Sequence, residues 1–277
     1  MRFLLSALSA VLLVLVVLLT PLSAVAVWTR AELGNEDRYV SAMAPLAHDD
    51  EVQDAVTDLI TDAVVEQGGT LTSAFEGLIR TGVRAFVESG AFPPVWEEAN
   101  RQAHESFNRT LTEEGAPVTI DLAPVVERAK QWLTDNGIPL ADQLPAIRAE
   151  FTLAPSGELD TARDTFRELE EAAVWLPPVT LVCAVGAVLA APRRRLGLLL
   201  AGLAVAVGGL LLRVWVGATR PAYLDRLPEE LPRSAGGAVY DALTETLRTA
   251  SWVIAGCGLV VAVLALVALL ARPRRTA

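Results

Sequence analysis

Side chains that carry covalent or metal chemistry are scarce in this sequence. Its 277 residues include two cysteines, two histidines and a single lysine, Lys130. Both cysteines, Cys183 and Cys257, lie inside long apolar runs, so the hydrophilic part of the chain has neither a disulfide framework nor a thiolate metal site. With one lysine and no cysteine outside these runs, covalent catalysis has few candidate nucleophiles.

Sequence motifs of catalysis and nucleotide binding are also missing. The chain has no G-x-S-x-G turn for a serine nucleophile and no H-E-x-x-H pair for zinc. Neither glycine-rich phosphate loop, G-x-x-x-x-G-K-[ST] or G-x-G-x-x-G, occurs in it. We therefore expect a protein that is not an enzyme, and we assign no catalytic, cofactor-binding or metal-binding residues.

What the sequence has instead is four long runs without any charged residue. They are Phe3–Val27, Ala172–Ala191, Leu196–Leu212 and Ala250–Ala271. A helix needs about 20 apolar residues to cross the hydrocarbon core, and the third run reaches that length when it is extended past Arg213 to Val216. The pattern predicts four transmembrane helices, over residues 3–27, 172–191, 196–216 and 250–271.

Basic and acidic residues lie at opposite ends of these runs. Arginines flank alternate ends, at Arg2, Arg193-Arg194-Arg195 and Arg272/Arg274/Arg275. Every Asp and Glu lies between the first and second runs or between the third and fourth. Because short Arg-rich ends stay in the cytoplasm, we expect both termini, the hairpin 192–195 and the tail 272–277 inside the cell membrane. The domain 29–171 and the loop 218–249 are then extracytoplasmic.

The first run has a second interpretation. Ala24-Val25-Ala26 resembles an A-x-A cleavage site, so the segment up to Ala26 could be a signal peptide that is removed. The apolar stretch Phe3–Leu19 is longer than the usual ~7–15 residues of a signal-peptide core, and Arg2 is its only basic flank. We prefer an uncleaved signal anchor and keep cleavage as the alternative.

The predicted exterior domain is strongly acidic. Residues 29–171 hold 28 acidic and 11 basic residues. Such a surface repels nucleic acid and attracts cations or basic partners, although solubility of an exposed domain is the plainer explanation of the same charge. The segment is long enough for one compact domain with its own core.

Apolar residues recur at helical spacing through most of this domain. The expected helices cover 49–66 and 71–86, and a third extends from Pro93-Pro94 to about Gly115. Gly68-Gly69 is expected to end the first of them and Ser89-Gly90 the second.

A small β element is expected near the end of the domain. Segments 117–122 and 149–153 are predicted to pair as a two-stranded ribbon, with a helix over 124–136 between them that Gly137 caps. A last helix begins at Ser156-Gly157 and continues directly into the second span. The fold class is therefore a mainly α membrane protein with four transmembrane helices, an α-rich extracytoplasmic domain and a two-stranded β element.

Two features of the domain deserve testing as metal sites. Four aspartates follow one another at four-residue spacing, namely Asp50, Asp54, Asp58 and Asp62. They form a straight ridge of mutually repelling charges, without the converging loop of a calcium site, so we favour a solvated helix face. His104 shares a helix with Glu97, Arg101 and Asn108, but it lacks a paired histidine, so we expect it and His48 to be ordinary structural or surface residues.

Within the spans, one charge and several small residues stand out. Arg213 lies close to the outer interface, where it can snorkel to water. Pro177-Pro178 lies at the start of the second span, where a kink costs least. Pairs of small residues four apart favour close helix approach or self-association, and they are Gly186/Ala190, Ala204/Gly208 and Gly258/Ala262.

Several short segments carry a resemblance. They are Trp28, Asp37–Val40, Pro45–Ala47, Val52-Gln53, the spaced Trp96…Asn100…His104, Thr119–Leu122 and Arg193–Arg195. Over most of its length the chain resembles a group of uncharacterised actinobacterial four-pass integral membrane proteins with an extracytoplasmic domain between the first and second spans. The resemblance implies a bacterial cell membrane and no established activity.

The order of one span, an exterior domain and three further spans is also similar to four-pass ABC subunits of cell-division and macrolide-efflux systems. Those subunits engage an ATPase through an element between the second and third spans. Here that connection, 192–195, is only about four residues long. We therefore expect a non-enzymatic envelope protein whose exterior domain binds a partner or ligand, with a transport-related subunit as the alternative. The expected partners are the lipid bilayer and another protein or a second copy, but not nucleic acid.

Overall fold

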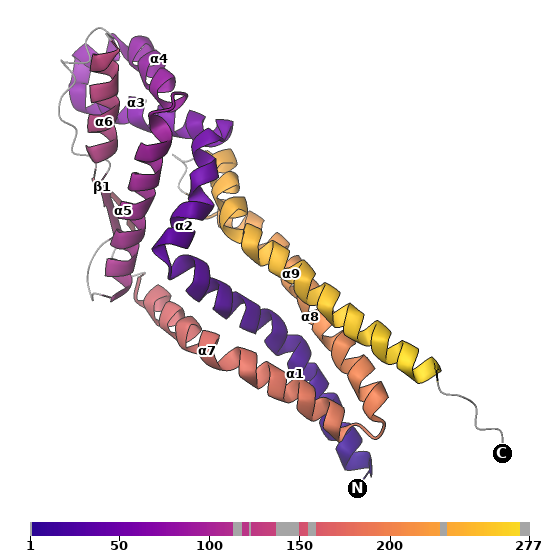
Figure 1. The fold of residues 1–277 in the computed structure, drawn as a ribbon. Helices are drawn as coiled ribbons and strands as arrows, with labels where there is room; N and C mark the ends of the chain where they lie inside the picture. The colour runs from indigo at the N-terminus through magenta and orange to yellow at the C-terminus, as the bar shows by residue number, and fades with distance from the viewer. Residues whose placement is uncertain are drawn as a thin grey trace, which may run out of the picture. The chain divides into compact units, whose positions relative to one another are not determined.

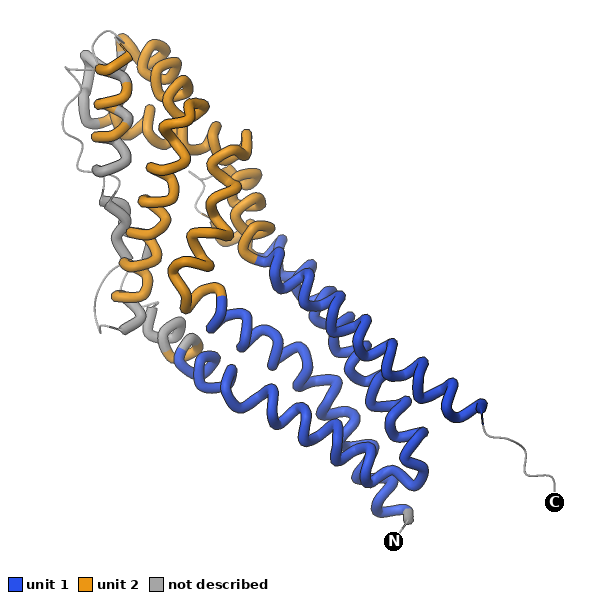
Figure 2. Tube along the Cα trace, viewed as in Figure 1, with its two compact units in different colours: residues 1–31, 167–222, 244–277 blue, residues 32–166, 223–243 orange. Residues whose placement is uncertain are grey.

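The computed structural model describes residues 2–112, 118–121, 123–136, 150–154, 159–227 and 232–271. The chain divides into two compact units, which are coloured separately in Figure 2. Unit 1 comprises residues 1–31, 167–222 and 244–277, and unit 2 comprises residues 32–166 and 223–243.

Four helices are long and apolar enough to cross a membrane. They extend over Phe3–Leu33, Arg167–Ala190, Arg194–Leu224 and Arg233–Leu270. The chain is therefore a mainly α-helical, multi-pass integral membrane protein, and the four predicted apolar runs lie within these helices except for their last residues Ala191 and Ala271.

Unit 1 is built from four long helices (Figure 1). They are α1 (Arg2–Trp28), α7 (Leu159–Ala190), α8 (Arg194–Leu224) and α9 (Arg233–Leu270). The helix α7 passes through Pro177 and Pro178 without interruption and continues from its polar start into the apolar run, as predicted. Its predicted start at Ser156-Gly157 lies outside the described residues.

The helices of unit 1 approach closely where small residues face one another. The Ser9 hydroxyl of α1 donates to the Ala187 carbonyl of α7 at 2.9 Å, and a Cβ added at Gly186 would lie 3.3 Å from Leu12 of α1. A Cβ added at Gly208 of α8 would lie 2.7 Å from the Cβ of Thr20 on α1. Two of the predicted small-residue pairs therefore face α1.

The helices α8 and α9 come into backbone contact. A Cβ added at Gly202 or Gly209 of α8 would lie 2.7 Å from the backbone nitrogen of Ala262 or Ala255 on α9. From the opposite side, a Cβ added at Gly258 would lie 2.5 Å from the backbone nitrogen of Ala206. The prediction for Gly258/Ala262 is confirmed, whereas Gly202 and Gly209 were not anticipated.

The segment 218–249, treated above as a loop, is mostly helix. The helix α8 continues to Leu224, and α9 begins at Arg233. A helix that has already formed lengthens by one hydrogen bond for each residue added, so an apolar span extends readily into polar sequence.

Unit 2 is dominated by short helices. In chain order they begin with the π-helix η1 (Thr29–Leu33), α2 (Glu36–Met43) and the 3₁₀ helix η2 (Ala44–His48), followed by α3 (Asp50–Ser73), α4 (Glu76–Val87), α5 (Phe92–Thr112) and α6 (Ala123–Asp135). The Asn35 side chain accepts from the Arg38 amide at 3.0 Å and caps α2, and Asp49 accepts from the Val52 amide at 3.1 Å at the start of α3.

The prediction that Gly68-Gly69 ends the first helix is wrong, because α3 continues to Ser73. A glycine inside a helix costs only about 1 kcal/mol relative to alanine. Packing of Ile60 and Val64 against α4 in a shared core opposes that cost. The helices α5 and α6 lie close to their predicted positions, whereas α4 begins at Glu76, five residues after its predicted start at Leu71.

Two strands, β1 (Val118–Asp121) and β2 (Glu150–Ala154), pair antiparallel, with Ile120 opposite Phe151. The helix α6 lies between them in the sequence. The positions proposed above as a helix end and a cap, Gly115 and Gly137, lie outside the described residues.

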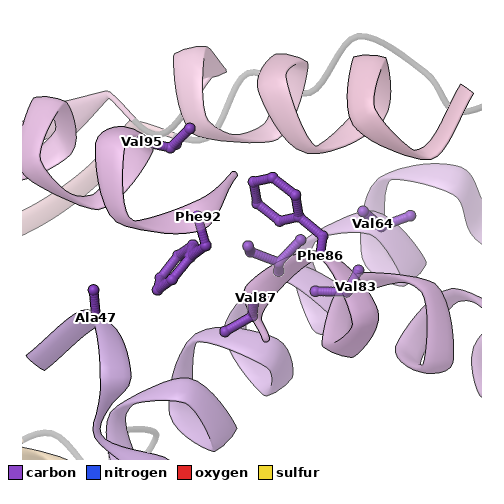
Figure 3. Close-up of a cluster of buried hydrophobic side chains, with 8 residues drawn as sticks. Ala47, Val64, Val83, Phe86, Val87, Phe92 and Val95 are labelled. Atoms are coloured by element: carbon purple, nitrogen blue, oxygen red, sulfur yellow. The ribbon is translucent and has the colours of Figure 1, made fainter. Parts of the chain in front are cut away.

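The core of unit 2 is shown in Figure 3. Phe86 and Phe92 are each 1% exposed, and their rings meet edge to face with centroids 6.0 Å apart. The remaining buried members of the cluster come from η2, α3, α4 and α5 and are Ala47, Ile60, Val64, Val83, Val87 and Val95. Trp132 of α6 adds a ring 5.7 Å from Phe86. This core fixes α3, α4, α5 and α6 as one body.

Candidate functional site

The polar face of α5 is the most chemically varied part of unit 2. Trp96, Asn100, His104 and Asn108 follow one another at four-residue spacing and therefore share one side of the helix. The Trp96 indole donates to the Met43 carbonyl at 2.8 Å, and the Asn100 amide donates to the Trp96 carbonyl at 2.8 Å. The first bond joins α5 to the end of α2, and the second lies within α5 and satisfies the buried Asn100 amide.

His104 is the centre of this face and is 4% exposed. Its Nε2 lies 2.9 Å from the Leu33 carbonyl, which can only accept, so Nε2 carries the proton. Its Nδ1 lies 3.3 Å from the Asn108 amide nitrogen and is then the acceptor. Both ring nitrogens of His104 therefore have hydrogen-bond partners within unit 2.

Of the three residues that share a helix with His104 in the prediction, Asn108 contacts it, whereas Glu97 is exposed and Arg101 is engaged elsewhere. Arg101 pairs with Glu36 at 3.2 Å and with Glu98 at 3.0 Å. His48, the second histidine, is exposed at the end of η2. No group of three His, Cys, Asp or Glu side chains in the described part of the chain is placed to hold a metal ion.

Tyr39 lies beside His104, and Glu32 precedes Leu33 in the chain. The ring of Tyr39 lies 5.1 Å from the imidazole, and burial raises the pKa of its phenol above the ordinary value of 10.0. Glu32 is 7% exposed, and its carboxylate lies 3.6 Å from the Arg38 guanidinium. No sequence pattern distinguishes Glu32, because one acidic residue after an apolar run resembles an ordinary span boundary.

The aspartate ridge of α3 is partly neutralised by the neighbouring helix. Asp54 pairs with Arg84 at 2.9 Å, and Asp58 pairs with Arg80. Both arginines are also four residues apart, on α4, so the two rows of charge match across the helix pair. All four aspartates remain accessible to water, and the two in the middle of the ridge also pair with arginines of α4.

These pairs are exposed ion pairs, with side chains between 43% and 57% accessible. Exposed pairs contribute about 0–1 kcal/mol each. Hydrogen bonding to Glu88 and the charge of Asp54 raise the pKa of Arg84, and hydrogen bonds from Gln102 and Arg101 lower the pKa of Glu98. Such groups favour a charged surface at neutral pH and provide no acid or base near pH 7.

Unit 1 carries one tryptophan near the same end of each span. Trp28 ends α1, Trp175 and Trp252 lie near the start of the apolar parts of α7 and α9, and Trp215 lies late in α8. The contacts of Ser9 and Gly186 place the start of α1 beside the end of α7, so these four positions all lie at the end opposite Arg193–Arg195. Trp175, Trp215 and Trp252 are 70%, 51% and 61% exposed. Tryptophans are enriched at the interface between a bilayer and water.

The opposite end of unit 1 is basic. The Arg195 guanidinium donates to the Ala268 carbonyl, one of the last carbonyls of α9. Arginine at a helix C-terminus satisfies a carbonyl without an intrahelical partner and complements the helix dipole. Tryptophan and arginine therefore mark the two ends of the membrane bundle.

The described residues thus hold a hydrogen-bonded histidine, a row of surface ion pairs and a bundle of long apolar helices. The free cysteines Cys183 and Cys257 lie in α7 and α9, within the spans. Comparison of the chain with protein-family models, with curated proteins and with solved structures gave no match.

Proposed function

We propose that this chain is a non-enzymatic protein of a cell envelope, with unit 2 on the extracytoplasmic side, where its acidic surface binds a basic protein partner. The observation that carries the proposal is the arrangement of charge along the spans. The arginine-rich ends are opposite the tryptophan-bearing ends, and all 33 acidic residues lie beyond the latter. The positive-inside rule makes the arginine-rich end cytoplasmic.

The exposed carboxylates support a role in binding. Glu76, Glu88, Glu98 and Glu105 have side chains between 51% and 66% accessible although each lies near an arginine. Complementary charge accelerates encounter with a basic partner and makes binding sensitive to salt. The buried surface of unit 2, by contrast, is taken up by its own core.

Orientation is tested by labelling single cysteines in intact cells. In a background with C183A and C257A, A85C places a thiol at an exposed position of α4, and R194C places one in the hairpin. A maleimide that cannot cross membranes should label A85C in intact cells and R194C only after permeabilisation. The reverse pattern would exclude an extracytoplasmic unit 2.

Binding is tested by crosslinking the full-length protein in its native membrane and identifying stoichiometric partners. The matched variant D50N/D62N removes two exposed charges that have no ion pair within the described ranges. We expect a basic partner whose yield falls in this variant and in high salt. If the yield of the partner is the same in the variant and in high salt as in the wild type at low salt, charge-based binding is excluded.

A transport-related subunit is the second candidate. Its support is the order of spans and exterior segment alone. The connection between α7 and α8 extends only from Ala190 to Arg194, which leaves no room for a helix that engages an ATPase. A stoichiometric ATPase in the crosslinking experiment would nevertheless favour this candidate. The resemblance to actinobacterial membrane proteins stays a prediction.

A further inference from the structure

The hairpin between α7 and α8 carries three consecutive arginines, which the proposed function uses only as a marker of orientation. Arg193 and Arg194 are exposed, and neither has a hydrogen-bond or ion-pair partner among the described residues. Arg195 is engaged through its bond to the Ala268 carbonyl of α9. Two guanidinium groups at this end of unit 1 are therefore available to an anion.

The hairpin differs in this respect from the arginines of unit 2. Ion pairs there join guanidinium groups to nearby carboxylates, and the arginines in such pairs are Arg38, Arg80, Arg84, Arg101, Arg109 and Arg233. Along α7, the acidic residue nearest to the hairpin is Glu171, about 28 Å before Ala190 at 1.5 Å per residue. Asp225 beyond α8 and Glu245 on α9 lie further from it along their helices. An acidic side chain of these helices therefore cannot neutralise the hairpin.

Further basic residues lie at the same end of unit 1. The bond from Ser9 to Ala187 places the start of α1, and with it Arg2, beside the hairpin (Figure 1). The bond from Arg195 to Ala268 brings the end of α9 there as well. In the sequence, the end of α9 is followed by Arg272, Arg274 and Arg275. No Asp or Glu occurs before residue 32, between residues 172 and 224 or after residue 245, so the side-chain charge gathered at this end is positive.

The position of the hairpin along the bundle favours a lipid as the source of the anion. Leu189, Leu196 and Leu270 are 61%, 44% and 76% exposed, and each lies within four residues of an arginine in the sequence. The guanidinium groups therefore lie at the edge of the apolar surface, at the level of phospholipid headgroups. The connection itself extends only from Ala190 to Arg194, which leaves little polar surface for a protein or a nucleic acid to cover.

We propose that the arginine hairpin, Arg193–Arg195, binds headgroups of anionic phospholipids in the leaflet on its side of the membrane. A guanidinium donates charge-assisted hydrogen bonds to phosphate oxygens, often two in parallel. Because this end lacks acidic side chains, it attracts a lipid of net negative charge more strongly than a zwitterionic one. Arg193 and Arg194 provide the donors, while the bond of Arg195 to α9 holds the hairpin in place. The proposal does not depend on which side of the membrane is the cytoplasm.

Native mass spectrometry of the detergent-purified full chain tests this proposal. The probes are anionic phosphatidylglycerol and zwitterionic phosphatidylethanolamine with the same acyl chains, and we expect the first to be retained in preference. R193Q/R194Q should bind phosphatidylglycerol about 25-fold more weakly, since each basic residue near an anionic leaflet contributes about fivefold. R193K/R194K keeps the charge and should keep most of the binding. The control R80Q/R84Q changes the net charge equally at ion-paired arginines of α4 and should bind like the wild type.

Four results would overturn the proposal. Equal retention of the two lipids by the wild type, or unchanged phosphatidylglycerol binding by R193Q/R194Q, would exclude a selective site at the hairpin. An equal loss in R80Q/R84Q would show an effect of net charge alone. Inorganic phosphate that displaces the lipid better than chloride at the same ionic strength would identify a free anion as the ligand. If R193Q/R194Q does not insert into the membrane, the wild-type comparison of the two lipids still decides.

Discussion

The two units of this protein are packed in opposite ways. In unit 2, Phe86 and Phe92 are 1% exposed, and the surface carries charge. In unit 1, the buried contacts are made by Gly202, Gly209 and small neighbours, while large side chains such as Trp175 and Leu264 are 70% and 63% exposed. Each arrangement follows from its solvent. Burial of large apolar groups is favourable in water, whereas in lipid there is no hydrophobic driving force for it.

The difference shows what holds each unit together. Unit 2 gains stability from the apolar area that it removes from water. Unit 1 gains stability from van der Waals contact between helices whose backbones approach each other, so the absence of a side chain is what matters there. Removing a large buried side chain should therefore destabilise unit 2, whereas adding a side chain at a helix contact should destabilise unit 1.

The largest effect is expected from F86A in the core of unit 2. Truncating a fully buried phenylalanine should lower the free energy of unfolding by about 3–5 kcal/mol, because it leaves a cavity beside Phe92 and Trp132. Thermal unfolding of the purified protein measures this. The control F75A removes a ring that is already 42% exposed and should change stability far less. Equal effects would show that the cluster is not the core.

The corresponding test in unit 1 adds a side chain rather than removing one. G258L should destabilise the bundle by about 3 kcal/mol, since its Cβ would meet the backbone of α8. The matched control is G256L, two residues earlier on the same helix, where a Cβ meets nothing within 4 Å. Thermal stability in detergent should fall for the first variant alone. A similar loss in both would contradict the packing of α8 on α9.

The two histidines provide a smaller comparison inside unit 2. H104A removes the partner of the buried Leu33 carbonyl and of Asn108, and should cost about 1–3 kcal/mol. H48A changes an exposed residue and should stay within about 0.5 kcal/mol of the wild type. Chemical unfolding followed by tryptophan fluorescence distinguishes them. A stable H104A protein would imply that His104 has a task other than packing.

The smallest effect concerns the ion pairs between α3 and α4. D58N should cost less than about 1 kcal/mol, and the cost should shrink further in high salt. D62N removes an exposed charge from the same ridge and should be neutral or slightly stabilising, because repulsion with Asp58 is relieved. Unfolding at two ionic strengths measures both. A salt-independent loss in D58N would argue against an electrostatic origin.

Periodicity and hydropathy predicted the spans and most helices, because both depend on local residue order. The end of α3 was predicted wrongly, since the packing of Ile60 and Val64 depends on a neighbour that local sequence does not specify. The pairing of Asp54 with Arg84 was missed for the same reason. The aspartates of α3 and the arginines of α4 share a four-residue spacing, which the sequence shows. Only the register of the two helices shows that the aspartates lie opposite the arginines.

Helix contacts inside the membrane bundle were harder to predict from the sequence. Small-residue pairs pointed to helix contacts, and Gly208 and Gly258 do lie at such contacts. Gly202 and Gly209 were overlooked because an evenly apolar helix has no polar face to indicate which side meets a neighbour. The lack of a partner at the Arg213 Nε likewise becomes visible only once the surrounding helices are placed.

The contact between Thr20 and Gly208 has a consequence for synthesis of the chain. Roughly 165 residues separate α1 from the start of α8, which at a typical rate of about 5–20 residues per second takes on the order of ten to thirty seconds. Of the other three long helices only α7 is made within that interval, so α1 can contact it through Ser9 and Ala187 before α8 exists. The helices α8 and α9 then follow as a second hairpin, which Arg195 and the glycine contacts join internally. The bundle is thus assembled from two hairpins, and its completion waits for the last part of the chain to leave the ribosome.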